Sequence, residues 1–354
     1  MATDSGLSHV SDMKTVQLIA HGAPGTMELR DLPAPNPGPE DVVVRVGACG
    51  LNRLDLWAEE GALPIPIALP RTLGSEIAGE ILSVGSNVTS WRAGDRVAVQ
   101  SNLYCGECEF CMRGEESICV RGQLMGVQRD GGFAEQVLAP AASLIALPDA
   151  VSFETSAALS LAGSTAMHML TTRARVCSGD WVLVIGGTSG VGSAAIQIAK
   201  QLGAYVISTG STAAKREFAS RIGADYVVDS ADGAWPAEVR KITGKRGVDL
   251  IVEHVGGSVL LQCLECLARG GSIVTCGATA GREVAIQLWP LFVKEQSIVG
   301  SYGRNRADLQ NTLLWAEQGK LKPAIDKTYS LAETSNAFAQ LRDRAVMGKL
   351  LVKP

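Results

Sequence analysis

A glycine-rich turn near the middle of the chain joins an apolar run to a helix-like stretch. The segment VLVIGGTSGVGSAAIQIAK spans residues 182–200 and spaces its glycines as G-x-x-G-x-G. Glycines at such a turn let the backbone approach a pyrophosphate closely, and the following helix offers free N–H groups at its start. A merely structural turn is the alternative. We predict that a dinucleotide binds here, at Gly187, Thr188, Ser189, Gly190, Val191 and Gly192.

The surrounding pattern strengthens this prediction, because a glycine cluster alone is weak evidence. From about Leu161 to Gly300, apolar strand-like runs alternate with helical ones, which indicates a doubly wound parallel sheet. Before Leu161 the chain is rich in short strand-like runs punctuated by turns such as NPGPED and RAGD. The expected fold class is α/β, with a β-rich part and a Rossmann sheet.

Length and composition narrow the function. A chain of 354 residues predicts about two domains, and its net charge of -4 with 5% aromatic residues argues against a nucleic-acid partner. No apolar run reaches about 18 residues, so no membrane span is expected. The first dozen residues lack the apolar core of a signal peptide, and the nine cysteines fit a reducing, cytoplasmic setting.

The segment after the second Rossmann strand bears on the choice of coenzyme. NAD-binding folds commonly place an acidic residue at the strand end to hold the ribose 2′-hydroxyl. Here the segment is ISTGSTAAKRE, residues 207–217, in which Thr209 is a further candidate for coenzyme binding, and Ser211, Thr212 and Lys215 offer hydroxyls and a cation instead of an acid. These groups suit a 2′-phosphate, so NADP(H) is predicted. In the alternative, Lys215 and Arg216 only solvate a helix start.

Four cysteines lie close together in YCGECEFCMRGEESIC. Cys105, Cys108, Cys111 and Cys119 have the spacing C-x2-C-x2-C-x7-C. Four thiolates complete the tetrahedral shell of zinc and leave no position for substrate, so we predict one structural zinc ion. Two disulfides are the competing interpretation, but three cysteines spaced three apart suit that geometry poorly.

The β-rich half, the cysteine spacing and the glycine turn together resemble the medium-chain dehydrogenase/reductase superfamily. The motifs LGSEIAGEILSVGSNVTSWRAGDRV, GGFAEQVLAP and GKLLVKP add to the resemblance, which runs from about Lys14 to Pro354. It implies a GroES-like substrate domain formed by residues 14–160 and 301–354. Residues 161–300 would form the Rossmann domain, and the active site would lie between the two.

Alcohol dehydrogenases of this superfamily carry a second, catalytic zinc, and its ligand positions differ here. The resemblance places Asn52, Ser75 and Leu161 where those enzymes have cysteine, histidine and cysteine. These residues do not form a usual zinc ligand set. The pattern GLNRLD with GSE resembles the quinone-oxidoreductase branch, which transfers hydride without metal and in which a lysine matching Lys215 contacts the 2′-phosphate. That branch often has a tyrosine where this chain has Ser230.

The resemblance also implies pocket residues. Asn52 and Asp55 match polar residues at the cleft floor, and Trp57 matches an aromatic wall; these three are the catalytic candidates. The positions that would contact the nicotinamide half are Thr165, Gly277 and Ser301, and His254 lies at a strand end near the coenzyme. For His254 a packed interior histidine is an equal alternative.

These predictions favour an NADPH-dependent reductase of quinones or α,β-unsaturated carbonyl compounds. An alcohol dehydrogenase or ketone reductase is the first alternative, and a coenzyme-binding protein with little turnover is the second. The expected partner is a small-molecule substrate. By analogy with the superfamily, the strand SIVGSYG suggests a dimer edge, so a homodimer or homotetramer is possible.

Overall fold

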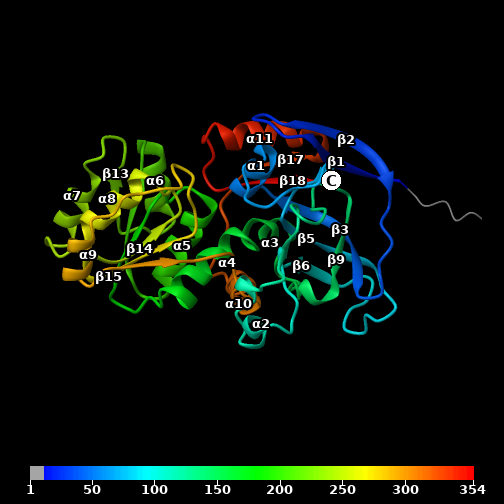
Figure 1. Ribbon diagram of the computed structural model, residues 1–354, viewed down its shortest axis with the longest axis horizontal. Coiled ribbons are helices and arrows are strands. Elements are labelled where there is room, and N and C mark those ends of the chain that lie inside the picture. Colours follow the sequence, from blue (N-terminus) through cyan, green and yellow to red (C-terminus); the bar gives the residue numbers. More distant parts are fainter. Residues whose placement is uncertain (1–11) are drawn as a thin grey trace, which may run out of the picture.

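The molecule has two lobes, each built around its own sheet (Figure 1). The computed structural model describes residues 12–354. All but the last of the first dozen residues, which were compared with a signal peptide, therefore lie outside the described residues. In Figure 1 the green-to-orange lobe contains α5 to α9, and the other lobe joins the blue and cyan N-terminal half to the red C-terminal segment.

The second lobe is a six-stranded parallel sheet in the order β13-β12-β11-β14-β15-β16. Its strands are β11 (Trp181–Val184), β12 (Tyr205–Gly210), β13 (Tyr226–Asp229), β14 (Val248–Glu253), β15 (Leu267–Thr275) and β16 (Ser297–Gly300). Its helices are α5 (Gly190–Gln201), α6 (Ala213–Arg221), α7 (Trp235–Ile242), α8 (Ser258–Cys266) and α9 (Leu288–Val293). The strand order reverses between β11 and β14, which is where dinucleotides bind in such sheets. The predicted Rossmann fold is confirmed.

The central strand β11 shows why an apolar run forms the middle of this sheet. Val182 and Val184 belong to the core on one face, whereas Leu183 and Ile185 belong to the core on the other. Successive strand residues point to opposite faces, so a strand covered on both sides must be apolar throughout.

The first lobe holds mostly antiparallel sheets. Its main sheet runs β10-β6-β5-β3-β18-β17, with β9 also paired to β3, and a smaller sheet runs β2-β1-β4. The strands are β1 (Asp12–Ala20), β2 (Thr26–Pro33), β3 (Asp41–Gly50), β4 (Arg71–Thr72), β5 (Glu76–Val84), β6 (Arg96–Val99), β7 (Asn102–Leu103), β8 (Gln123–Leu124), β9 (Gln136–Pro140), β10 (Leu144–Ala146), β17 (Ile325–Ser330) and β18 (Lys349–Lys353). The helices are α1 (Arg53–Glu60), α2 (Glu109–Met112), α3 (Phe153–Leu159), α4 (Ala162–Met167), α10 (Arg306–Glu317) and α11 (Thr334–Arg342).

The C-terminal strand returns to this first lobe. β18 pairs antiparallel with β3, and Leu351 lies opposite Gly50. The strand therefore brings its first residue, Lys349, next to the start of α1. The return of this segment was expected, whereas the exact domain limits at residues 160 and 301 remain a prediction.

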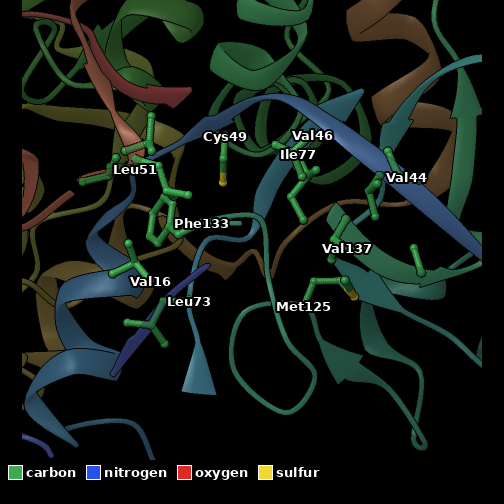
Figure 2. Packing of buried hydrophobic residues seen from close by; sticks show 14 of the residues in the cluster. Val16, Val44, Val46, Cys49, Leu51, Leu73, Ile77, Met125, Phe133 and Val137 are labelled. Carbon is green, nitrogen blue, oxygen red and sulfur yellow. The ribbon is translucent and has the colours of Figure 1, made fainter. Parts of the chain in front are cut away.

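The core of the first lobe is packed between its two sheets and α11 (Figure 2). Phe133 meets Phe338 of α11 edge to face, with ring centroids 5.8 Å apart. Val44 and Val46 of β3 and Ile77 of β5 belong to the same core, and Figure 2 shows all three to one side of Phe133. Edge-to-face packing adds to the burial of two large rings, so α11 is firmly attached to the lobe.

Helices α3 and α4 join the lobes, because α4 contacts both α3 and α5, and α10 packs on α4. The short π-helical turn His168–Arg173 extends α4, and His168 is buried there against Asp308 of α10 at 2.7 Å. This histidine is therefore packed inside the protein. Among residues 12–354, no helix is both long and apolar enough to cross a bilayer.

Candidate active site

A cavity of about 410 Å³ lies between the two lobes. Ten of the predicted site residues line it: Asn52, Trp57, Thr165, Thr188, Ser189, Gly190, Val191, Lys215, His254 and Gly277. Six others lie outside its lining: Asp55, Gly187, Gly192, Thr209, Ser211 and Ser301. The cavity thus meets the glycine-rich turn on one wall and the start of α1 on another.

The glycine-rich turn is held in shape by a cap on α5. Ser189 is the residue before the helix, and its Oγ accepts a hydrogen bond of 2.9 Å from the N–H of Gly192. A Cβ on Gly192 would lie 2.3 Å from the carbonyl oxygen of Gly186, so the turn requires glycine there. Gly186 itself has a φ of +63°. The turn therefore brings the start of α5, at Gly190 and Val191, to the wall of the cavity.

Two predicted coenzyme residues support this turn. Thr209 is buried, and its Oγ1 accepts a hydrogen bond of 2.9 Å from the N–H of Gly186. His254 Nε2 lies 3.2 Å from Ser189 Oγ, and burial lowers the pKa of this histidine. A neutral imidazole facing the cavity fits a coenzyme wall better than a charged one would.

The nicotinamide half would meet the opposite part of the cavity. Thr165 on α4 is buried and lines it, and Gly277 lies so close to β14 that a Cβ would be 2.4 Å from the carbonyl oxygen of His254. Ser301 is buried beside this region, and its N–H donates to Thr275.

Basic side chains gather where β12 leads into α6. Lys215 donates a hydrogen bond of 3.4 Å from Nζ to the carbonyl oxygen of Arg344, and both residues line the cavity. Arg53 also lines it, and burial together with the charge of Arg344 lowers the pKa of Arg53. Ser211 is exposed beside them. This end of the cavity is built for an anion.

The floor of the cavity contains a buried ion pair. Lys349 Nζ lies 2.6 Å from Glu76 Oε2, and it also donates to Asn52 Oδ1 at 2.7 Å and to the carbonyl oxygen of Leu51 at 2.5 Å. The amide of Asn52 in turn donates to Glu76 at 3.0 Å and to the carbonyl oxygen of Gly50 at 3.3 Å. All three N–H donors of the lysine and both of the amide are thereby engaged.

The other oxygen of Glu76 ties the floor to α4. Glu76 Oε1 accepts hydrogen bonds from the N–H groups of Leu161 at 2.6 Å and Ala162 at 3.0 Å. Leu161 lines the cavity, and the buried hydroxyl of Ser75 donates to the carbonyl oxygen of Met125 at 2.6 Å. Of the three positions compared with catalytic zinc ligands, Asn52 and Leu161 therefore bond to Glu76, whereas the Ser75 hydroxyl bonds to Met125.

Asp55 and Trp57, the remaining catalytic candidates, lie in different surroundings. The carboxylate of Asp55 accepts hydrogen bonds from the N–H groups of Asn52 at 2.7 Å and Gly74 at 3.2 Å, behind the cavity wall. Burial raises its pKa to about 7. Trp57 lies two residues further along α1 and lines the cavity.

The four predicted zinc ligands come together in the loop between β7 and β8. The sulfurs of Cys105 and Cys119 are 3.5 Å apart, as are those of Cys108 and Cys111, and two further pairs are at 3.9 Å. A zinc tetrahedron with bonds of about 2.3 Å has edges of about 3.8 Å, so the cluster fits the ion. Backbone donation, chiefly from Glu107, lowers the pKa of the Cys105 thiol to about 6, which favours a thiolate ligand.

Zinc bound by these residues would supply a cross-link that fixes the loop. Among residues 12–354, this is the one group of three or more His, Cys, Asp or Glu side chains arranged to hold a metal. The isolated pair Cys263 and Cys266 is buried on α8, in agreement with a packing role.

Two residues of the cavity, Lys349 and Arg304, were not predicted from the sequence. Lys349 belongs to the quoted GKLLVKP motif, but its spacing from Glu76 carries no sign of their contact. Arg304 is buried and lines the cavity, yet it lies in a loop after β16 that offers no recognisable motif. For Lys349 the available signal was a basic residue beside the apolar run of β18, whereas Arg304 lies in the polar stretch SYGRNRAD.

A cleft between a sheet of Rossmann topology and a β-rich lobe is typical of oxidoreductases that use a nicotinamide coenzyme. Two family models match the chain: an alcohol dehydrogenase GroES-like domain over residues 38–149 and a zinc-binding dehydrogenase over residues 190–318. The chain belongs to the zinc-containing medium-chain dehydrogenase/reductase superfamily, which confirms the resemblance seen in the sequence.

Individual relatives cover almost the whole chain. An NAD-dependent alcohol dehydrogenase of Sulfolobus acidocaldarius is 32% identical and is matched over 96% of this chain and 99% of its own. An acryloyl-coenzyme A reductase of Sulfurisphaera tokodaii is 31% identical over 95% and 99%. The crystal structure of an NAD-dependent alcohol dehydrogenase has a TM-score of 0.93 and 38% identity, over 97% of this chain and all of that one (100%).

Proposed function

We propose that the protein is an NADPH-dependent reductase of α,β-unsaturated carbonyl compounds or quinones, and that it transfers hydride without a catalytic metal. The observation that carries this proposal is the network of Lys349, Glu76 and Asn52 on the cavity floor. The lysine ammonium, at 2.6 Å from Glu76 and 2.7 Å from Asn52, already places a cation beside one of the three positions compared with zinc ligands. A second cation there would be repelled.

The coenzyme preference is supported by the basic end of the cavity. Lys215, Arg53 and Arg344 line this end, and β12 is followed by the hydroxyl residues Ser211 and Thr212 where an acid would favour NAD. The doubly charged 2′-phosphate of NADPH matches such a group better than a ribose hydroxyl does.

Each part of the site has a defined task in this proposal. NADPH, when bound, supplies the hydride. The glycine-rich turn would hold its pyrophosphate, and Thr165 and Gly277 would hold its nicotinamide half. Asn52 and Glu76 would keep Lys349 fixed at the cavity floor. Trp57 and Leu161 would keep water out of the cavity.

Conjugated acceptors suit such a site. Hydride added to the β-carbon of an enone moves charge onto the carbonyl oxygen as an enolate, which hydrogen-bond donors and positive potential stabilise. The related acryloyl-coenzyme A reductase bears the name of a conjugated carbonyl substrate, which supports this class. The names of the other two relatives favour an alcohol dehydrogenase as the alternative.

A substrate panel separates these functions. NADPH oxidation would be measured with an enone and a quinone, and NADP⁺ reduction with saturated alcohols. Reduction of the conjugated acceptors supports the proposal, whereas preferential alcohol oxidation supports the alternative. Turnover of neither, together with tight coenzyme binding, would indicate a binding protein.

The assembly we propose is a homodimer through the edge of the second sheet. β16 is the last strand of that sheet, and the neighbouring α9 exposes 67% of Leu288, 72% of Trp289 and 57% of Phe292. Apolar side chains grouped at a sheet edge are typical of an interface. Light scattering of the wild type and of Trp289→Glu tests this, because the variant should be monomeric.

A further inference from the structure

Arg304 is a buried arginine that faces the cavity. It is 2% exposed, and it belongs to the loop between β16 and α10. Its Nη1 donates to Asn102 Oδ1 at 2.8 Å and its Nη2 donates to Ser101 Oγ. The preceding Gly303 has a φ of +57°, and a Cβ there would lie 2.7 Å from Asn102 Nδ2. The glycine therefore lets the loop press against Asn102 and present the guanidinium.

The charge of this arginine is not neutralised within the protein. Among the described residues, no carboxylate oxygen lies within 4.0 Å of its guanidinium nitrogens, although Glu76 is near enough to oppose the effect of burial on its pKa. Burial lowers this pKa to about 10, so the group is charged at neutral pH. A buried charge is normally paired, because desolvation without compensation is costly.

Several buried polar atoms near Arg304 also lack hydrogen-bond partners among the described residues. Within residues 12–354, Nε of Arg304 has no hydrogen-bond partner, and neither does the side chain of Gln100 or the hydroxyl of Ser301 on the same two segments. Unsatisfied buried groups in one place commonly mark a site for a ligand or water.

The other basic residues of the cavity are already accounted for. Within residues 12–354, the cavity lining includes no acidic residue. It includes five lysines and arginines: Arg53, Lys215, Arg304, Arg344 and Lys349. Lys349 is saturated by its three acceptors. Arg53, Lys215 and Arg344 face the expected coenzyme phosphate. Arg304 is the remaining cation, and it touches β7 of the substrate lobe.

We infer that Arg304 binds a carboxylate of the substrate, so that the enzyme reduces enone acids in which the carboxylate is separate from the carbonyl that activates the double bond. A guanidinium fork matches a carboxylate in shape and charge. This inference rests on the proposed reductase function. In the reaction, the hydride and its electron pair go to the β-carbon, a solvent proton ends on the α-carbon, NADPH becomes NADP⁺, and the carboxylate is unchanged.

A matched pair of substrates tests the inference. The pair is an enone acid, with two methylene groups between the double bond and the carboxylate, and its methyl ester. The wild type should prefer the acid by roughly tenfold to a hundredfold in kcat/KM, the effect of a hydrogen-bonded charge pair. In Arg304→Met this preference should disappear, mainly through a higher KM for the acid, and Arg304→Lys should restore part of it. Arg30→Met, which removes the same charge from the exposed edge strand β2, is the control.

A binding measurement keeps the inference separate from the proposed function. The saturated keto acid and its methyl ester are titrated calorimetrically into the wild-type protein saturated with NADPH, where no turnover is needed. Tighter binding of the acid supports the role of Arg304 even if the enzyme reduces neither enone, or if Arg304→Met fails to fold. Equal binding of acid and ester overturns it. It is also overturned if Arg304→Met weakens NADPH binding, or lowers kcat equally for acid and ester, because the group would then serve the coenzyme or the enolate.

Discussion

Lys349 and Glu76 form an ion pair of 2.6 Å, and their side chains are only 5% and 0% exposed. The pair joins the last strand, β18, to the first residue of β5, and it lies beside Asn52 on the cavity floor. The lysine neutralises the buried carboxylate, and Asn52 bonds to both partners.

Removing the lysine should destabilise the protein. Lys349→Met leaves Glu76 buried without its cation, so we expect the free energy of unfolding to fall by about 3–5 kcal/mol, as measured by urea denaturation. The double variant Lys349→Met/Glu76→Gln should lose less, because the uncompensated charge is gone. If the single and double variants are equally unstable, the pair does not have this electrostatic role.

The four-cysteine site predicts one zinc ion per chain. Cys108→Ser should abolish zinc binding and lower the thermal midpoint, because metal binding is coupled to folding of the loop. Elemental analysis checks the metal content. Cys177→Ser is the matched control, since Cys177 is exposed and outside the cluster, and it should retain zinc. Two zinc ions per wild-type chain would instead favour the alcohol dehydrogenase alternative.

Lys215 should determine much of the preference for NADPH. Lys215→Ala should weaken NADPH binding by roughly 1–3 kcal/mol, the size of a hydrogen bond to a charged group, and should change NADH binding little. Fluorescence titration measures both. Lys241→Ala, at an exposed position on α7, serves as control. Equal affinity of the wild type for the two coenzymes would contradict the assignment.

Asp55 should make stability depend on pH. Its pKa is raised in the folded protein to about 7, from an ordinary value of 3.8. The folded state therefore binds the proton more tightly than the unfolded state, and the resulting stabilisation is complete below about pH 4 and lost as the pH rises to about 7. Asp55→Asn, although less stable overall, should lack this part of the pH slope. Urea denaturation of the wild type and the variant, at a series of pH values between about 4 and 7, measures how the free energy of unfolding depends on pH. Identical dependence in the two proteins would contradict the raised pKa of Asp55.

Local patterns were enough to predict much of the fold. The glycine-rich turn with its flanking apolar strand predicted the Rossmann sheet, because strand, turn and helix are adjacent in the sequence. The cysteine spacing likewise predicted a cluster within one loop. In both cases the interacting groups are close neighbours along the chain, so their spacing in the sequence predicts how they are arranged in space.

The floor of the cavity depends instead on contacts between distant segments. Glu76, Asn52 and Lys349 come from β5, the start of α1 and β18, and no spacing rule connects them. Asn52 was predicted to be a catalytic residue, and that role remains a prediction, but both of its amide N–H groups face protein oxygens. Arg304 was missed for the same reason, since its partners lie on the β6–β7 segment.

The central claim is that hydride reaches a conjugated acceptor without a catalytic metal. The most direct test is the rate of NADPH oxidation with an enone, measured on protein that was dialysed against a chelator and then analysed for zinc. We predict that the rate persists when the protein holds no more than the one zinc ion of the four-cysteine site, and that saturated alcohols with NADP⁺ give little or no turnover. Rapid alcohol oxidation that disappears when a second zinc ion is removed would contradict the claim.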